Sequence, residues 1–205
     1  MQNNIELDSN VFGNNERLSL IAGPCVLESH SHAKMMVEHL LKINDNFKLN
    51  FVYKTSFDKA NRTSLSSVRG LGIDESLKIF SDLKSEYKIK ILTDVHNENQ
   101  CDLVKDFVDI IQIPAFLCRQ TDLLIAAANT NKIVNVKKGQ FLAPWDMKNV
   151  IKKIEESGNK NILITERGAS FGYNTLVSDM RALPIMSKFG FPIAVSYTHL
   201  RAHET

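Results

Sequence analysis

The segments 133–140, IVNVKKGQ, and 161–167, NILITER, decide the fold class. Each joins a short run of apolar, mostly β-branched residues to charged or polar residues at its carboxyl end. Such short, nearly continuous apolar runs are typical of parallel strands that are covered on both faces. Together with five similar runs, they predict strands over residues 18–22, 50–53, 89–93, 108–113, 133–136, 161–165 and 192–195.

Segments with a helical period of apolar residues lie between these runs. They predict helices over 33–43, 74–87, 145–157 and 176–187, the last with a bend or break at Pro184. Alternation of strand and helix favours an α/β fold with a parallel sheet. Seven strands fit either an open doubly wound sheet or most of a (β/α)8 barrel. A complete barrel typically needs about 250 residues, and this chain has 205.

The composition argues against several classes of protein. There are 25 Lys and Arg against 23 Asp and Glu, a net charge of +2, so no global basic field indicates a nucleic-acid partner. The longest apolar run, 123–128, is too short to cross a membrane, and the polar N-terminus does not resemble a signal peptide. Cys25, Cys101 and Cys118 are too widely spaced for a disulfide framework. We therefore expect a reduced, cytoplasmic protein.

Polar side chains follow six of the predicted strands, at the end where ligands bind in parallel α/β folds and barrels. In chain order they are Cys25 and Glu28; Lys54, Lys59, Asn61, Arg62 and Thr63; Asp94 and His96; Gln112, within the end of its strand, which runs into Pro114 and Ala115; Lys137, Lys138 and Gln140; and Glu166 and Arg167. Six such ends in one sheet predict a single shared site.

The charge of this predicted site is mainly positive. Six cations, at positions 54, 59, 62, 137, 138 and 167, face two carboxylates, Asp94 and Glu166. Lysine and arginine are the side chains that bind phosphate, so the pattern favours a multiply anionic ligand, and two phosphorylated substrates better than one. Because neighbours on a strand face opposite ways, we expect Lys137 to point inward and Lys138 to be a surface or structural lysine.

The end of the chain differs from the rest. Residues 1–193 are interpreted as one barrel-type domain, in part. From about residue 194, the polar string ending YTHLRAHET has no helical or strand period and reads as translated adapter sequence, so 194–205 is interpreted as a non-native tail.

Six motifs carry a resemblance to a known family. They are IAGPCVLES (21–29), KTSFDKANRTS (54–64), ILTDVH (91–96), IIQIPAFLCRQTDL (110–123), VNVKKGQF (134–141) and ERGASFGYN (166–174). In this order they resemble the 3-deoxy-D-manno-octulosonate 8-phosphate synthases, also named 2-dehydro-3-deoxyphosphooctonate aldolases. The related 3-deoxy-arabino-heptulosonate 7-phosphate synthases share the GPC motif, but carry Lys-Pro-Arg-Thr after the second strand, where this chain has Asp58-Lys59-Ala60-Asn61-Arg62-Thr63.

The resemblance implies a (β/α)8 barrel that condenses phosphoenolpyruvate with D-arabinose 5-phosphate, for lipopolysaccharide assembly. The motif positions imply that Lys54, Lys59, Gln112, Ala115, Lys137 and Arg167 hold phosphoenolpyruvate. In the same way, Asn61, Arg62 and Thr63 would hold the pentose phosphate, Gln140 would complete the wall, and Lys59, Asp94 and His96 would lie at the reacting centres. Family members tend to be tetramers, so a homo-oligomer is expected by analogy.

The resemblance also implies a metal ion and no organic cofactor. Metal-dependent members of the family have Cys at the position of Cys25, and a thiolate suits Zn²⁺, Fe²⁺ or Mn²⁺. The family's next ligand is a histidine in an Asp-x-Thr-His segment, for which Ser196-Tyr197-Thr198-His199 is the match here. Ser196 replaces the aspartate. The remaining ligands and the eighth strand would follow residue 205, so the chain is expected to be C-terminally truncated.

Two alternatives to this enzyme remain open at this point. One is the sibling synthase that uses erythrose 4-phosphate, against which the Asn61-Arg62-Thr63 motif counts. The other is an inactive phosphate-binding fragment, because an incomplete barrel has two unpaired strand edges and half a metal shell.

Overall fold

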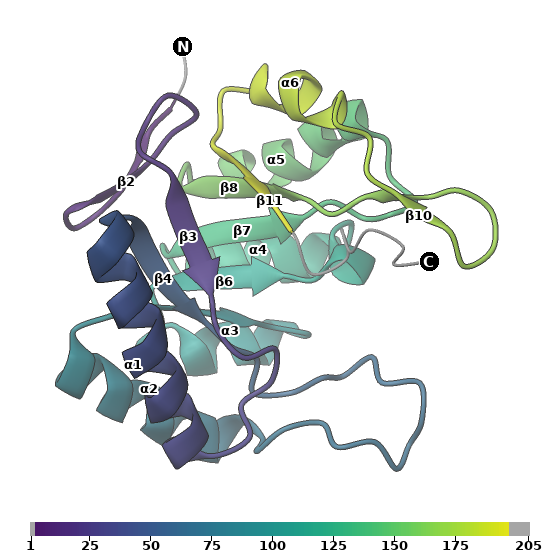
Figure 1. Ribbon diagram of the computed structural model, residues 1–205. Helices are drawn as coiled ribbons and strands as arrows, with labels where there is room; N and C mark the ends of the chain where they lie inside the picture. The colour runs from purple at the N-terminus through teal and green to yellow at the C-terminus, as the bar shows by residue number, and fades with distance from the viewer. Residues whose placement is uncertain (1–2, 197–205) are drawn as a thin grey trace.

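The computed structural model describes residues 3–196 and has a curled sheet of parallel strands (Figure 1). All seven predicted strands are present within a few residues of the expected bounds. In sheet order they are β3 (Ser19–Ala22), β4 (Asn50–Lys54), β5 (Lys90–Asp94), β6 (Ile110–Ile113), β7 (Ile133–Lys137), β8 (Ile162–Glu166) and β11 (Ile193–Val195). Each strand pairs in parallel with the neighbour that precedes or follows it in this order.

Helices cross over between these strands and cover the outer face of the curl (Figure 1). They are α1 (His30–Phe47), α2 (Ile73–Tyr87), α3 (Glu98–Val104), α4 (Thr121–Asn129), α5 (Met147–Glu156) and α6 (Ala182–Ser187), with short 3-10 turns η1 (Ala115–Leu117) and η2 (Pro144–Asp146). Outward side chains such as Val134 and Val136 pack against buried helical residues such as Leu124 and Ile151 in one large core. Since helices lie on only one face of the sheet, the structure is an incomplete (β/α)8 barrel rather than a doubly wound sheet.

The predicted helix over 176–187 is wrong in its first half. Leu176–Val177 forms β10, which pairs antiparallel with β9 (Ala169–Ser170). The helix begins only at Ala182, so Pro184 lies in its first turn. A helix does not use the backbone N–H groups of its first turn, and proline is tolerated there.

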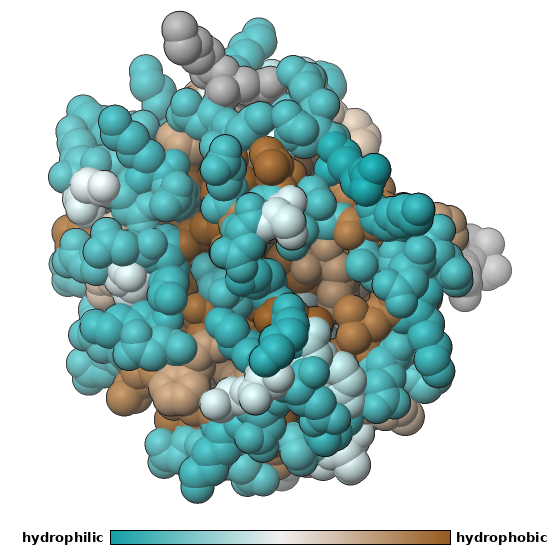
Figure 2. Space-filling model, turned by 90° about the vertical axis from the view of Figure 1, so that its left-hand side faces the viewer, coloured by the Kyte–Doolittle hydropathy of each residue, from teal (hydrophilic) through white to brown (hydrophobic). Residues whose placement is uncertain are grey.

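The inner face of the sheet is apolar at the amino ends of the strands. Val52, Leu92, Ile110, Ile133 and Leu163 form a second buried cluster there. An antiparallel hairpin, β1 (Ile5–Leu7) with β2 (Asn10–Phe12), adds its buried residues Ile5 and Phe12 to this cluster. The sequence reading did not predict this hairpin, which covers the amino end of the barrel interior. The face shown in Figure 2 is largely hydrophilic, and apolar side chains are visible between the polar ones.

An open seam separates β3 from β11. Within residues 3–196, each of these two strands pairs on one side only. A cavity of about 360 Å³ lies between them, lined by both strands, by Leu163 and by the chain that leads from the hairpin into β3. The sheet is therefore a barrel that does not close within the described residues. None of the helices in that part of the chain is both long and apolar enough to span a bilayer.

Candidate active site

The inner face changes from apolar to polar toward the carboxyl ends of the strands. Side chains alternate between the two faces of a strand, so Ile133, Asn135 and Lys137 of β7 share the inner face. The same period places Gln112 beyond Ile110, Asp94 beyond Leu92, Lys54 beyond Val52, and Thr165 beyond Leu163. These inward polar side chains are called the polar ring, and they continue the inner face beyond the apolar cluster. They are Lys54, Asp94, Gln112, Asn135, Lys137 and Thr165.

A chain of hydrogen bonds crosses this ring from strand to strand. The Thr165 hydroxyl donates to Asn135 Oδ1 at 2.7 Å, and Asn135 Nδ2 donates to Gln112 Oε1 at 2.9 Å. Gln112 Nε2 donates in turn to Asp94 Oδ1. On the other side, the Ser56 hydroxyl donates to Asp94 Oδ2 at 2.6 Å. Asp94 is therefore the common acceptor at the centre of the ring.

Asp94 is a buried carboxylate that stays charged. Burial raises the pKa of Asp94, but the charges of Lys54 and Lys137, the Ser56 hydrogen bond and the charge of Lys59 together hold it well below its usual value. Three lysines near one carboxylate leave an excess of positive charge. The arrangement suits the binding of an anion.

Lys59 and Lys137 have different surroundings at the polar ring. Lys59 Nζ donates to the Ser56 hydroxyl at 2.9 Å and lies 3.9 Å from Asp94 Oδ2. Lys137 is the inward lysine, as predicted. Burial and the neighbouring charge of Lys54 lower the pKa of Lys137 to about 8, and Asp94 opposes this shift. Lys137 is thus mostly charged at neutral pH but close to its titration.

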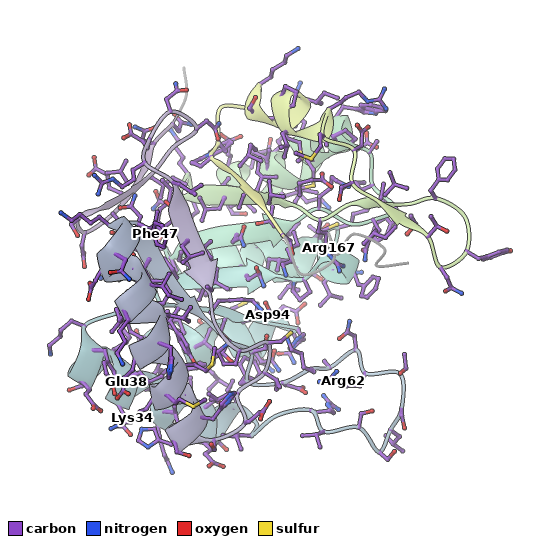
Figure 3. All side chains as sticks on the ribbon, viewed as in Figure 1. Lys34, Glu38, Phe47, Arg62, Asp94 and Arg167 are labelled. Carbon is purple, nitrogen blue, oxygen red and sulfur yellow. The ribbon has the colours of Figure 1, made fainter. Side chains whose placement is uncertain are left out.

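Arg167 extends the positive charge beyond β8. Its guanidinium is largely buried, which lowers the pKa of Arg167, and its charge acts on Lys137. Figure 3 shows Arg167 and Asp94 near the middle of the molecule. The buried residue Ala115 begins η1 directly after β6. Gln140 follows β7 and lines a second cavity of about 260 Å³.

Cys25 and His96 complete the cluster. Burial raises the pKa of Cys25, but the charges of Lys59 and Lys54 outweigh it, so the thiol pKa is lowered overall. The His96 ring packs edge-on against Phe57, with centroids 5.8 Å apart. Burial lowers the pKa of His96, although Asp94 and Asp58 oppose this. Its buried Nδ1 has no hydrogen-bond partner among the described residues.

The structure does not bring Asn61, Arg62 and Thr63 into this cluster. They lie exposed on a long loop between β4 and α2, which projects away from the sheet (Figures 1 and 3). An ion pair joins Asp58 to Arg69 at the base of this loop, where Arg69 Nε lies 2.8 Å from Asp58 Oδ1. Arg62 Nε donates to the Val68 carbonyl within the loop, at 3.3 Å. The predicted role of the three residues stays a prediction.

Lys138 and Glu166 do not belong to the polar ring. Their side chains are buried together on the outer side of β7 and β8, with Lys138 Nζ 3.6 Å from Glu166 Oε1. This confirms that Lys138 is a structural lysine. The positive site consequently contains Lys54, Lys59, Lys137 and Arg167 rather than all six cations of the sequence pattern.

A metal centre is not assembled by the described residues. Within residues 3–196, no three His, Cys, Asp or Glu side chains gather in a way that could hold a metal ion. Cys25 is one candidate ligand, whereas a zinc site takes three or four protein ligands. The other predicted ligand, His199, lies outside the described residues. The described residues alone do not supply enough ligands to fit a metal site, and the metal stays a prediction.

Sequence reasoning missed three residues of the site, Ser56, Asn135 and Thr165. Asn135 and Thr165 interrupt otherwise apolar strands at inward positions. That signal could have identified them, because a polar residue inside a buried strand needs a hydrogen-bond partner.

Comparisons with known proteins give the family to which the chain belongs. The sequence profile of the DAHP synthetase I family matches residues 3–204. The chain is 62% identical over 195 residues to a protein of Chelativorans sp. (strain BNC1) named 2-dehydro-3-deoxyphosphooctonate aldolase, and the match covers 95% of this chain and 71% of that protein. Proteins of the same name from Brucella canis and Brucella ovis are 60% identical over the same length, which is 70% of each. The chain therefore belongs to the DAHP synthetase I family of enzymes.

Proposed function

We propose that the chain condenses phosphoenolpyruvate with D-arabinose 5-phosphate, giving 3-deoxy-D-manno-octulosonate 8-phosphate and inorganic phosphate. The observation that carries this proposal is a group of four cations at the carboxyl end of the sheet: Lys54, Lys59 and Lys137 act on Asp94, and Arg167 acts on Lys137. The names of the relatives, at 60–62% identity, indicate the same octulosonate product.

The cations have a clear physical task in this reaction. Both substrates carry phosphate and repel each other, so a site that joins them must offset this repulsion and align the reacting carbons. Lys137, with a pKa of about 8, can also exchange a proton near neutral pH.

The bond changes balance with one water molecule. The methylene carbon of phosphoenolpyruvate attacks the aldehyde carbon of the pentose, and water adds to the neighbouring carbon. Phosphate then leaves by cleavage of its carbon–oxygen bond. Lys59, Asp94 and His96 are proposed at the reacting atoms because Lys59 Nζ lies 3.9 Å from Asp94 Oδ2 and the charge of Asp94 acts on His96.

Three further parts of this proposal come from the sequence. A divalent ion at Cys25, a homo-oligomer and a cytoplasmic location all accompany the octulosonate assignment.

The test is a product assay with matched aldehydes. The chain is incubated with phosphoenolpyruvate and either D-arabinose 5-phosphate or erythrose 4-phosphate, and the sugar product and released phosphate are measured. We expect product from the pentose and its loss in Lys59→Ala, whereas Lys160→Met, an exposed lysine at the opposite end of β8, serves as control.

The family description makes the heptulosonate synthase the second candidate. Product from erythrose 4-phosphate alone would establish that activity instead. Binding of phosphoenolpyruvate without any product would identify the chain as an inactive phosphate-binding fragment.

A further inference from the structure

The hydrogen-bond chain in the ring has a fixed direction. A carboxylate can only accept, whereas an amide has a donor end and an acceptor end. If the Gln112 amide were reversed, its carbonyl oxygen would face the oxygen of Asp94. Asp94 therefore requires Gln112 Nε2 on its side and leaves Gln112 Oε1 facing β7.

Each further hydrogen bond in the chain also needs a donor facing an acceptor. Gln112 Oε1 needs a donor, which is Asn135 Nδ2, and Asn135 Oδ1 needs a donor, which is the Thr165 hydroxyl. Asp94, Gln112 and Asn135 are direct neighbours in the register of β5, β6 and β7. Gln112, Asn135 and Thr165 are only 2%, 2% and 4% exposed. A buried polar group that loses its partner is costly, so the chain is expected to act as a unit.

We propose that Asn135 and Thr165 are positioning residues that fix the orientation of the Gln112 amide. In this orientation one N–H of Gln112 binds Asp94, and the second N–H of the same nitrogen is available to an anion held by the cations of the ring. Without Asn135, Gln112 Oε1 loses its donor and Asp94 alone holds the amide, so the second N–H is no longer held in a fixed direction toward that anion. The identity of the anion as phosphoenolpyruvate rests on the proposed function.

The experiment combines one readout of Gln112 with one of the ligand. The exchange rate of the Gln112 side-chain amide hydrogens is measured by NMR, and the dissociation constant of phosphoenolpyruvate by calorimetry. Thr165→Val removes the hydroxyl at nearly constant shape, Thr165→Ser keeps it, and Asn135→Leu removes the amide. Asn159→Leu is the matched control, because Asn159 is an equally buried asparagine that binds the carbonyls of Ala128 and Lys132 near the opposite end of the sheet.

We expect Thr165→Val and Asn135→Leu to speed Gln112 exchange and to weaken phosphoenolpyruvate binding about tenfold, the effect of one lost buried hydrogen bond. The KM for the pentose phosphate should change less than about twofold, because Gln112 is assigned to the other substrate. Thr165→Ser should restore both readouts. Asn159→Leu should lower the melting temperature and move neither. If Asn135→Leu does not fold, the Thr165 pair still decides the outcome.

Unchanged Gln112 exchange in Thr165→Val would overturn the positioning role, as would a Thr165→Ser variant as weak as Thr165→Val. Failure of the proposed function looks different. In that case the wild-type chain binds phosphoenolpyruvate but forms no octulosonate, and the positioning role is still judged from exchange and affinity. A wild-type chain that binds no phosphoenolpyruvate would overturn both.

Discussion

Lys138 Nζ lies 3.6 Å from Glu166 Oε1, and the side chains of these two residues are only 2% and 3% exposed. The ammonium group also donates to the carbonyls of Gly139, Leu142 and Gly168, at 3.2, 3.3 and 3.0 Å. One buried cation therefore ties the loop after β7 to the loop after β8, next to the ring but outside it.

Lys138→Met should destabilise the fold strongly, because it leaves Glu166 as a buried charge without its cation. Breaking a buried pair in this way costs about 3–5 kcal/mol, which urea unfolding measures. Adding Glu166→Gln to the variant should recover part of the loss. A loss below about 1 kcal/mol, the range of exposed pairs, would contradict the structural role.

Binding of phosphoenolpyruvate should be coupled to proton uptake by Lys137. Its pKa of about 8 is lowered by burial and by Lys54, and a bound phosphate should raise it again. Above about pH 8, phosphoenolpyruvate binding should therefore take up a proton, and its affinity should fall as the pH rises. Calorimetry at pH 8.5, in buffers of different ionisation enthalpy, measures the uptake. Lys137→Arg keeps the charge at this pH and should abolish the uptake, and equal uptake in this variant would assign the proton to another group.

Cys25 should be the most reactive of the three thiols. Lys59 and Lys54 lower its pKa against the effect of burial, whereas burial raises the pKa of Cys101 to about 12 and also raises that of Cys118. Because the thiolate is the nucleophile, iodoacetamide at pH 7 should label Cys25 first. Lys59→Met should slow this labelling and Lys160→Met should not, as read by mass spectrometry over a pH series. Equal labelling in both variants would show that Lys59 does not act on the thiol.

Gly23, directly after β3, lies at a position with no room for a side chain. A Cβ atom at this position would overlap the backbone of Lys54 on the neighbouring strand β4. Gly23→Ala should therefore cost about 1–3 kcal/mol in stability and move the loop that carries Cys25. Gly158→Ala measures the separate effect of backbone strain, because Gly158 has a positive φ but open space around it, whereas the φ of Gly23 is not positive. A loss below about 0.5 kcal/mol in Gly23→Ala, the range of ordinary surface substitutions, would leave no role for the contact with Lys54.

Asp94 should contribute stability that depends on pH. Its folded pKa is held below its unfolded value of about 4, so the carboxylate stabilises the fold above pH 4 and loses this effect as the pH falls through the folded pKa. Asp94→Asn should therefore cost most near neutral pH, where three lysines lose their counterion, and least in acid. Unfolding curves between pH 2 and pH 7 measure the difference, and a pH-independent cost would assign the effect to packing.

The strands and their polar ends were predictable because each rests on a local pattern. An apolar β-branched run followed by a charge is visible in the sequence, as at Lys137 and Arg167. The hairpin β1–β2 was not predictable in this way, because its strands are three residues long and lie in a polar segment. The partners of Asp94 were also hidden, since the contact of Gln112 with Asn135 depends on the register between two strands. The spacing of residues along the sequence does not reveal the register between two strands.

The open seam between β3 and β11 gives the two parts of the site different local stability. In the sheet order, β6 is the central strand, while β3 and β11 have a single neighbour each within the described residues. Local opening of a protein starts where few contacts hold the backbone, so edge strands should separate before the centre does. Asp94, Gln112 and Asn135 lie on the inner strands, but Cys25 follows the edge strand β3. The half of the site that contains Asp94, Gln112 and Asn135 should consequently persist during fluctuations that displace Cys25, and hydrogen exchange should be slowest in β6 and fastest in β3 and β11.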